Sequence, residues 1–246
     1  MVIFLFVLFA NLWIWRAFSL NFIIGTLMLA TSIFFHLTLS SSKISKISLL
    51  FLVLLLIFQW QTTNKVSLTY LDNDEQRVQK MRLQEYPPIH ITFANKNIWI
   101  PVAHWFEERN ETIVAGRIAN NFFQTIDINQ YFFASHPRER VGVKEFEKFP
   151  YFFLLPFLYG LALFLTKFSK KQFLVFLFLP LGLLSLVGYQ NDLGPYSLFP
   201  FFVSTIFLGT KDLHDKFFKK FPLRVKAIII ILILLIFIQT IGYASN

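Results

Sequence analysis

The sequence predicts an α-helical polytopic membrane protein with about seven transmembrane helices and a small α+β extracytoplasmic domain inserted between helices 3 and 4. Of 246 residues, 55% are hydrophobic and 15% are charged, whereas soluble domains contain about 25% charged residues. The hydrophobic residues gather in apolar runs, and one long connection between them has an ordinary globular composition. We therefore expect helices 1–3 in residues 1–60, the inserted domain in 61–149 and helices 4–7 in 150–246.

The apolar runs define the expected helices. They cover residues 2–15, 20–40, 47–60, 150–166, 172–188, 196–209 and 227–243. Several are shorter than the roughly 20 residues that cross a bilayer, but polar and aromatic flanks allow each to extend by a turn. The first run has no basic residues before it and no small-residue cleavage site after it, so we interpret it as a retained helix rather than a signal peptide.

The basic residues predict the orientation. Connections 41–46, 167–171 and 210–226 carry two, three and six Lys or Arg residues, whereas the short connections between them carry one and none. Short cytoplasmic loops are enriched in Lys and Arg. We therefore expect a protein of the plasma (inner) membrane with a cytoplasmic N-terminus, and with residues 61–149 and the C-terminus outside.

The net charge of +9 belongs to these cytoplasmic loops. The insert 61–149 contributes nothing to it, because its eleven basic residues match eleven acidic ones. Basic residues beside a membrane attract anionic lipid head groups. The expected partner of the positive charge is thus the bilayer, and a nucleic-acid partner is not expected.

The insert contains signals for three elements. Asp72 and Glu75 fit a capping box at the start of a short polar helix, which Pro87 and Pro88 end. Apolar and polar residues then alternate on both sides of a turn-rich bridge, which predicts a β-hairpin over 89–102.

A second helix is expected over 103–124, packed against the hairpin. On it, His104, Glu108 and Glu111 would share one stripe, and imidazole with carboxylates can hold a divalent metal. No second helix offers a matching set, so we expect no metal site. The acidic residues also suit the dipole of a solvated first turn.

The run Ser135–Arg140 precedes the fourth apolar segment and offers the strongest anion-binding chemistry. Arg138 and Arg140 flank Glu139, and Arg side chains bind phosphate or carboxylate in a bidentate manner. His136 beside them could transfer protons near neutral pH. The alternative is a solvated, ion-paired turn that rests on the lipid head groups.

Two further places carry candidate residues. Asp192 lies in the short turn 189–196 and could act as a general base at the outer face, although turns commonly use Asn-Asp and Gly-Pro pairs. His36, with Asn21 and Ser32, lies in the second apolar run, where polar residues either serve function or hydrogen-bond between helices.

The function we expect is that of an accessory or scaffold subunit in the cell envelope, whose outer domain binds a partner protein or a lipid head group. The partner would be a larger membrane subunit. The alternative is an enzyme acting at the outer face on a lipid-linked phosphate or sugar, with a layout loosely like that of glycosyltransferases. The chain lacks cysteine, glycine-rich phosphate loops and zinc-protease motifs, so we expect no cofactor.

Overall fold

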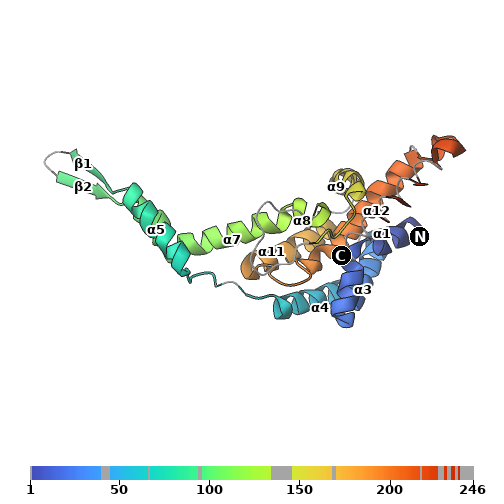
Figure 1. Ribbon diagram of the computed structural model, residues 1–246, viewed down its shortest axis with the longest axis horizontal. Coiled ribbons are helices and arrows are strands. Elements are labelled where there is room, and N and C mark those ends of the chain that lie inside the picture. Colours follow the sequence, from blue (N-terminus) through green and yellow to red (C-terminus); the bar gives the residue numbers. More distant parts are fainter. Residues whose placement is uncertain are drawn as a thin grey trace.

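The computed structural model describes residues 2–39, 45–65, 67–93, 96–133, 146–167, 170–216 and 218–226, and single positions of the last apolar run. The described residues are mostly helical, with one small antiparallel sheet (Figure 1). The molecule is elongated: helices gather in a bundle at one end, and the sheet lies at the other end (Figure 1).

The residues before the insert form helices α1 (Val2–Phe9), α2 (Leu12–Leu20), α3 (Phe22–Leu39) and α4 (Lys46–Thr62). The first apolar run was expected as one helix, but α1 and α2 are bent by 59°. Asn11 explains the break. Its side-chain oxygen accepts from Ile14 N and caps α2, while its amide nitrogen donates to the carbonyls of Val7 and Leu8. An Asn side chain thus replaces the backbone ladder at this point.

The seven-span topology is not supported by the described helices. Among the described residues, only α3 is both long and apolar enough to cross a membrane, with a mean hydropathy of 1.9, and the bent pair α1–α2 could add a second span. A helix of this kind near the N-terminus is typical of a membrane span or a signal sequence, and a buried core helix has the same composition. Three further apolar helices, Lys46–Thr62, Tyr151–Thr166 and Leu174–Val187, have 10–17 residues, and the helix Phe199–Lys216 has 18 residues but carries four charged ones near its end.

The residues after the insert form further helices of the bundle. They are the 3₁₀ turn η1 (Tyr151–Phe153), α9 (Leu154–Lys167), α10 (Lys170–Phe173), the π-helical turn η2 (Leu174–Phe178), α11 (Leu179–Val187), the 3₁₀ turn η3 (Tyr196–Leu198), α12 (Phe199–Lys216) and the 3₁₀ turn η4 (Phe218–Lys220). The π-helical turn ends at Phe178, two residues before Pro180. Proline lacks an amide N–H, and a local change of helix type accommodates the missing hydrogen bond.

The last two predicted crossings differ in how much of each the structure describes. The charged residues Lys211, Asp212, Asp215 and Lys216 belong to α12, which continues as one helix to Lys216. The predicted last crossing, 227–243, lies mostly outside the described residues.

The insert contains α5 (Asn73–Glu85), β1 (Ile89–Phe93), β2 (Lys96–Ile100), α6 (Val102–Glu107), α7 (Asn110–Ile126) and α8 (Asn129–Phe132). The polar helix and the hairpin are therefore confirmed. The second helix, expected over 103–124, is instead two helices that part at Glu108 and Arg109.

Residues 64–120, which we call the arm, have no hydrophobic core. Among the described residues of the arm, every side chain is exposed or intermediate. The prediction that the hairpin packs against the second helix is wrong, since every hairpin residue is exposed except the half-buried Ile100. The arm joins the bundle through the C-terminal half of α7, where Asn121 and Thr125 are buried and Asn121 Nδ2 donates to Ser185 O of α11 (3.1 Å).

The core of the molecule lies in the bundle and is strongly aromatic. Trp13 is fully buried, and its ring lies 5.6–5.8 Å from the rings of Tyr131, Phe149 and Phe199. Edge-to-face and offset arrangements at such distances are the favourable ones for aromatic pairs. Because Tyr131 belongs to α8, this cluster fastens the base of the insert to the bundle.

Candidate functional site

The end of the arm farthest from the bundle is a candidate interaction surface. We call residues 86–106 the tip; they comprise the hairpin and most of α6. Figure 1 shows the hairpin at the end of the molecule opposite the helical bundle. This position leaves the tip accessible to another molecule.

Local sequence signals position the tip. The capping box at the start of α5 is complete: Asp72 Oδ1 accepts from Glu75 N (2.7 Å), and Glu75 Oε2 accepts from Asp72 N (3.0 Å). Pro87 follows the helix and prevents its extension. The strands then pair antiparallel, with Ile89 opposite Ile100 and Phe93 opposite Lys96.

The tip exposes large apolar side chains on both faces of the hairpin and on α6. Phe93 is 72% exposed, Phe106 66% and Trp99 56%. Single exposed hydrophobic residues are ordinary, but contiguous apolar patches mark interaction sites. A two-stranded hairpin is also marginal alone in water, so a bound partner would stabilise it.

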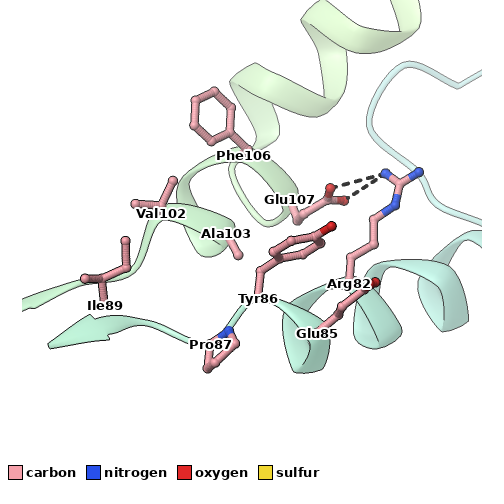
Figure 2. A pocket seen from close by; sticks show the side chains of 9 residues that line it. All are labelled: Arg82, Glu85, Tyr86, Pro87, Ile89, Val102, Ala103, Phe106 and Glu107. Atoms are coloured by element: carbon pink, nitrogen blue, oxygen red, sulfur yellow. Dashed lines mark hydrogen bonds and ion pairs between the residues drawn. The ribbon is translucent and has the colours of Figure 1, made fainter.

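A groove of about 390 Å³ lies between the end of α5 and α6 (Figure 2). Its apolar side is formed by Ile89, Val102 and Phe106. Its polar side is an ion pair in which Arg82 Nη1 donates to Glu107 Oε1 at 3.2 Å (Figure 2). The groove can therefore take an apolar side chain next to a hydrogen-bonding group.

Polar contacts hold α5 against α6 and α7. Arg117 Nη2 donates to Glu75 Oε2 (2.6 Å) and to Tyr70 O (3.1 Å), and Gln79 Nε2 donates to Glu107 O. Ion pairs with this exposure contribute about 0–1 kcal/mol each. The arm is thus braced by weak surface contacts, and its apolar residues stay free for another molecule.

The tip is almost uncharged. Residues 86–106 contain one charged residue, Lys96. The remaining charged residues of the insert lie within 65–85, 107–127 and 138–148. The absence of charge, together with exposed aromatic residues, resembles the centre of a protein–protein interface.

The expected stripe of metal-ligating residues is divided by the break between α6 and α7. His104 Nδ1 lies 2.7 Å from Glu108 Oε2, whereas Glu111 belongs to the next helix. No group of three His, Cys, Asp or Glu residues that could hold a metal ion occurs in the described part of the chain. His104 and Glu108 form an exposed pair with no third ligand from Glu111.

The predicted anion site lies outside the described residues. It comprises His136, Arg138, Glu139 and Arg140, so its chemistry stays a prediction. Asp192 is described and is exposed in its turn. Its neighbours form that turn, because Gly194 has a positive φ of 68° and Asn191 Oδ1 accepts from Leu193 N (2.9 Å).

The polar residues of the second apolar run have separate roles. Asn21 caps α3, with its side-chain oxygen accepting from Ile23 N and Ile24 N. Ser32 Oγ donates to Met28 O of the same helix. His36 stacks on Phe4 at 4.0 Å and lines a cavity at the end of the bundle.

Sequence reasoning missed two features of the structure. The apolar residues of the hairpin were expected in a core, although the lack of charge over residues 86–106 was a visible sign of an interaction surface. Lys148 was not singled out, yet it is 5% exposed, and its Nζ donates to Gln130 O (2.7 Å) at the aromatic cluster. No local pattern marks a lysine that becomes buried.

Comparisons with protein-family models, curated proteins and solved structures found no match for this chain. The functional argument therefore rests on the arrangement of the residues themselves.

Proposed function

We propose that the chain is a multi-pass protein of the cell-envelope membrane, in which the helical bundle spans the plasma (inner) membrane and the arm binds a partner protein on the outer side. It would serve as an accessory or scaffold subunit. The observation that carries the proposal is the exposed, almost uncharged tip at the end of an arm without a core.

The distribution of polarity in the bundle supports membrane insertion. Leu155, Phe22 and Leu50 expose 74%, 72% and 58% of their surface, whereas Gln59 and Ser204 are fully buried. Water would favour the opposite arrangement, while lipid accepts apolar side chains outside and polar residues at helix contacts. The 17 residues of α4 extend over about 26 Å, which a bilayer accommodates by slight thinning. This is why we retain seven crossings as part of the proposal.

The ends of the bundle support the proposed orientation. The root of the arm meets the turn 189–195, which has no Lys or Arg, through a hydrogen bond from Asn64 N to Gln190 O (3.0 Å). The basic residues Lys211 and Lys216 lie toward the other end of α12, and Lys219 and Lys220 follow in η4. The root of the arm and the basic residues thus lie at opposite ends of α12. The positive-inside rule predicts this arrangement when the arm is outside.

A partner protein suits the tip better than a lipid head group. Head groups attract basic residues, and the tip has a single lysine. The tip also lies at the end of α7, which extends beyond its contact with α11 (Figure 1). A protein surface with a complementary apolar patch can use both the hairpin and the groove.

Photo-crosslinking in cells that naturally express the chain tests this proposal. A benzophenone amino acid at Trp99 should give a discrete protein adduct, whereas the same group at Tyr70 should not. Tyr70 is 65% exposed but lies near the root of the arm, so it is the matched control. Phe93→Ser in the same chain should reduce the Trp99 adduct at least tenfold, since it removes an exposed apolar contact.

The proposal fails if Trp99 and Tyr70 give the same adducts, or if the tip gives none. If the tip crosslinks only to lipid, the partner is the membrane and the protein–protein proposal is wrong. The enzyme hypothesis stays a prediction, because its main residues lie outside the described part of the chain.

A further inference from the structure

A second cavity lies at the basic end of the bundle. It has a volume of about 650 Å³ and lies between the start of α1, the end of α3 and the second half of α12. Ile3, Leu39 and Phe207 contribute to its apolar wall, and His36 and Lys211 to its polar rim. This combination of an apolar wall and a polar rim suits an amphiphile.

The rim has an excess of positive charge. Asp215 lines the cavity, but its Oδ1 accepts from Lys219 Nζ at 2.8 Å, which offsets its charge. Lys211 has no carboxylate within ion-pair distance among the described residues, and its Nζ lies 5.9 Å from the Phe207 ring. A cation on the rim is therefore available to an anionic ligand.

Two imidazoles add hydrogen-bonding capacity. His36 is held by stacking on Phe4 at 4.0 Å and by an edge contact with Phe207 at 4.6 Å. Its Nδ1 has no hydrogen-bond partner in the described part of the chain. His214 Nδ1 lies 3.5 Å from Asp215 Oδ1, which is too long for a strong hydrogen bond. A buried polar atom without a partner is costly, and a ligand that supplied one would recover that cost.

We propose that this cavity binds an anionic phospholipid of the cytoplasmic leaflet. The phosphate head group interacts with Lys211 and the imidazoles, and the acyl chain lies along the apolar wall. The proposal rests on the membrane insertion and orientation proposed above, but it does not depend on the partner of the arm. It commits to a lipid, because a free phosphate would leave the apolar wall without a partner.

The test uses the full-length protein purified in detergent and titrated with phosphatidylglycerol or with phosphatidylcholine of the same chains. Binding is measured by native mass spectrometry. Lys211→Gln should weaken phosphatidylglycerol binding at least fivefold. Lys220→Gln is the matched control, because it removes the same charge from an exposed lysine outside the cavity lining, and it should change binding less than twofold. His36→Phe keeps an aromatic ring for stacking but removes Nδ1, and it should also weaken binding.

Equal losses in Lys211→Gln and Lys220→Gln would overturn the site, since they would indicate general attraction to negative charge. Equal binding of the two lipids would overturn it as well. Soluble glycerol phosphate that binds as tightly as phosphatidylglycerol would overturn the lipid assignment. Resistance of the chain to alkaline carbonate extraction is measured separately: a chain that is extracted contradicts membrane insertion, whereas a retained chain without lipid preference contradicts the cavity proposal alone.

Discussion

Glu147 lies at the junction where the chain leaves the base of the insert and approaches α9. Its Oε1 accepts from Tyr151 N at 3.1 Å, at the start of the turn η1. Burial raises the pKa of this carboxyl, while the hydrogen bond from Tyr151 N opposes the rise. Glu147 precedes the fourth apolar run and thus lies outside the proposed crossings. Ionised Glu147 therefore lowers the stability of the folded chain relative to the protonated form.

We predict that Glu147→Gln raises the melting temperature at neutral pH. Glutamine keeps the acceptor for Tyr151 N but carries no charge. Because the folded pKa lies above the unfolded one, the folded state binds more protons between the two values, and wild-type stability rises as pH falls through that window. The gain should be greatest at neutral pH, where wild-type Glu147 is ionised, and should shrink as the pH falls.

Thermal unfolding in detergent from pH 8 to pH 4 measures this effect. The two melting curves should converge as the pH falls and Glu147 becomes protonated. A constant difference between wild type and variant over the whole range would contradict the prediction, as would a less stable variant at neutral pH.

At the scale of elements, α9 and α12 approach each other most closely through two glycines. A Cβ atom built on Gly160 would overlap the carbonyl oxygen of Thr205, and one built on Gly209 would overlap that of Pro156. Small residues that allow backbones to meet are typical of helix pairs in membranes. Near the same crossing, Tyr159 OH donates to Asp212 Oδ2 at 2.6 Å. The contact between α9 and α12 therefore depends on the close approach of the two backbones at the glycines and on the Tyr159–Asp212 hydrogen bond.

We predict that Gly160→Ala destabilises the bundle by about 1–3 kcal/mol, because the added methyl group forces the two backbones apart. Gly182→Ala is the control: a Cβ there meets nothing within 4 Å, so the change should be neutral or stabilising by up to about 1 kcal/mol. Thermal unfolding in detergent compares the two variants. Equal stability of both would show that α9 and α12 tolerate separation at this point.

The arm differs from the bundle in what holds its elements together. Its helices and hairpin form from local signals, namely a capping box, a pair of prolines and alternating apolar residues. Its contacts are exposed ion pairs such as Arg82–Glu107. Local signals define secondary structure, but they do not state which faces become buried. This is why the hairpin could be predicted and its exposure could not.

At the scale of the whole molecule, the elongated shape keeps two different surfaces far apart. The aromatic bundle lies at one end, and the apolar hairpin lies at the other (Figure 1). The buried Lys148 and the Trp13 cluster connect the two at the base of the insert. In the proposed orientation the basic cavity faces the cytoplasm and the tip faces outward, so each end meets a different partner.

We predict that cysteines introduced at Asn191 and Trp99 react with an impermeant thiol reagent in intact cells, whereas a cysteine at Lys220 reacts only after permeabilisation. The natural chain has no cysteine, so labelling reports the introduced residue alone. The physical reason is the positive-inside distribution of Lys and Arg. Labelling of the Lys220→Cys variant in intact cells would reverse the proposed orientation.

Composition and spacing by themselves determined the helical class, the polar helix after Asp72 and the hairpin over residues 89–102. These features follow from hydrophobicity, capping and turn chemistry, which act within a few residues. The number of membrane crossings, predicted as seven, cannot be determined from these local features alone. Apolar length alone does not show that Asn11 breaks the first run or that a π-helical turn precedes Pro180.

Only the tertiary structure decided which residues lie close together and which are buried. It separated Glu111 from His104 by a helix break, left Asp192 exposed and gathered His36, Lys211 and His214 around one cavity. It also placed Lys148 among aromatic rings and left Phe93 and Trp99 exposed. Burial depends on contacts between segments far apart in the sequence, and the energy of such contacts is not encoded in the local pattern of either segment.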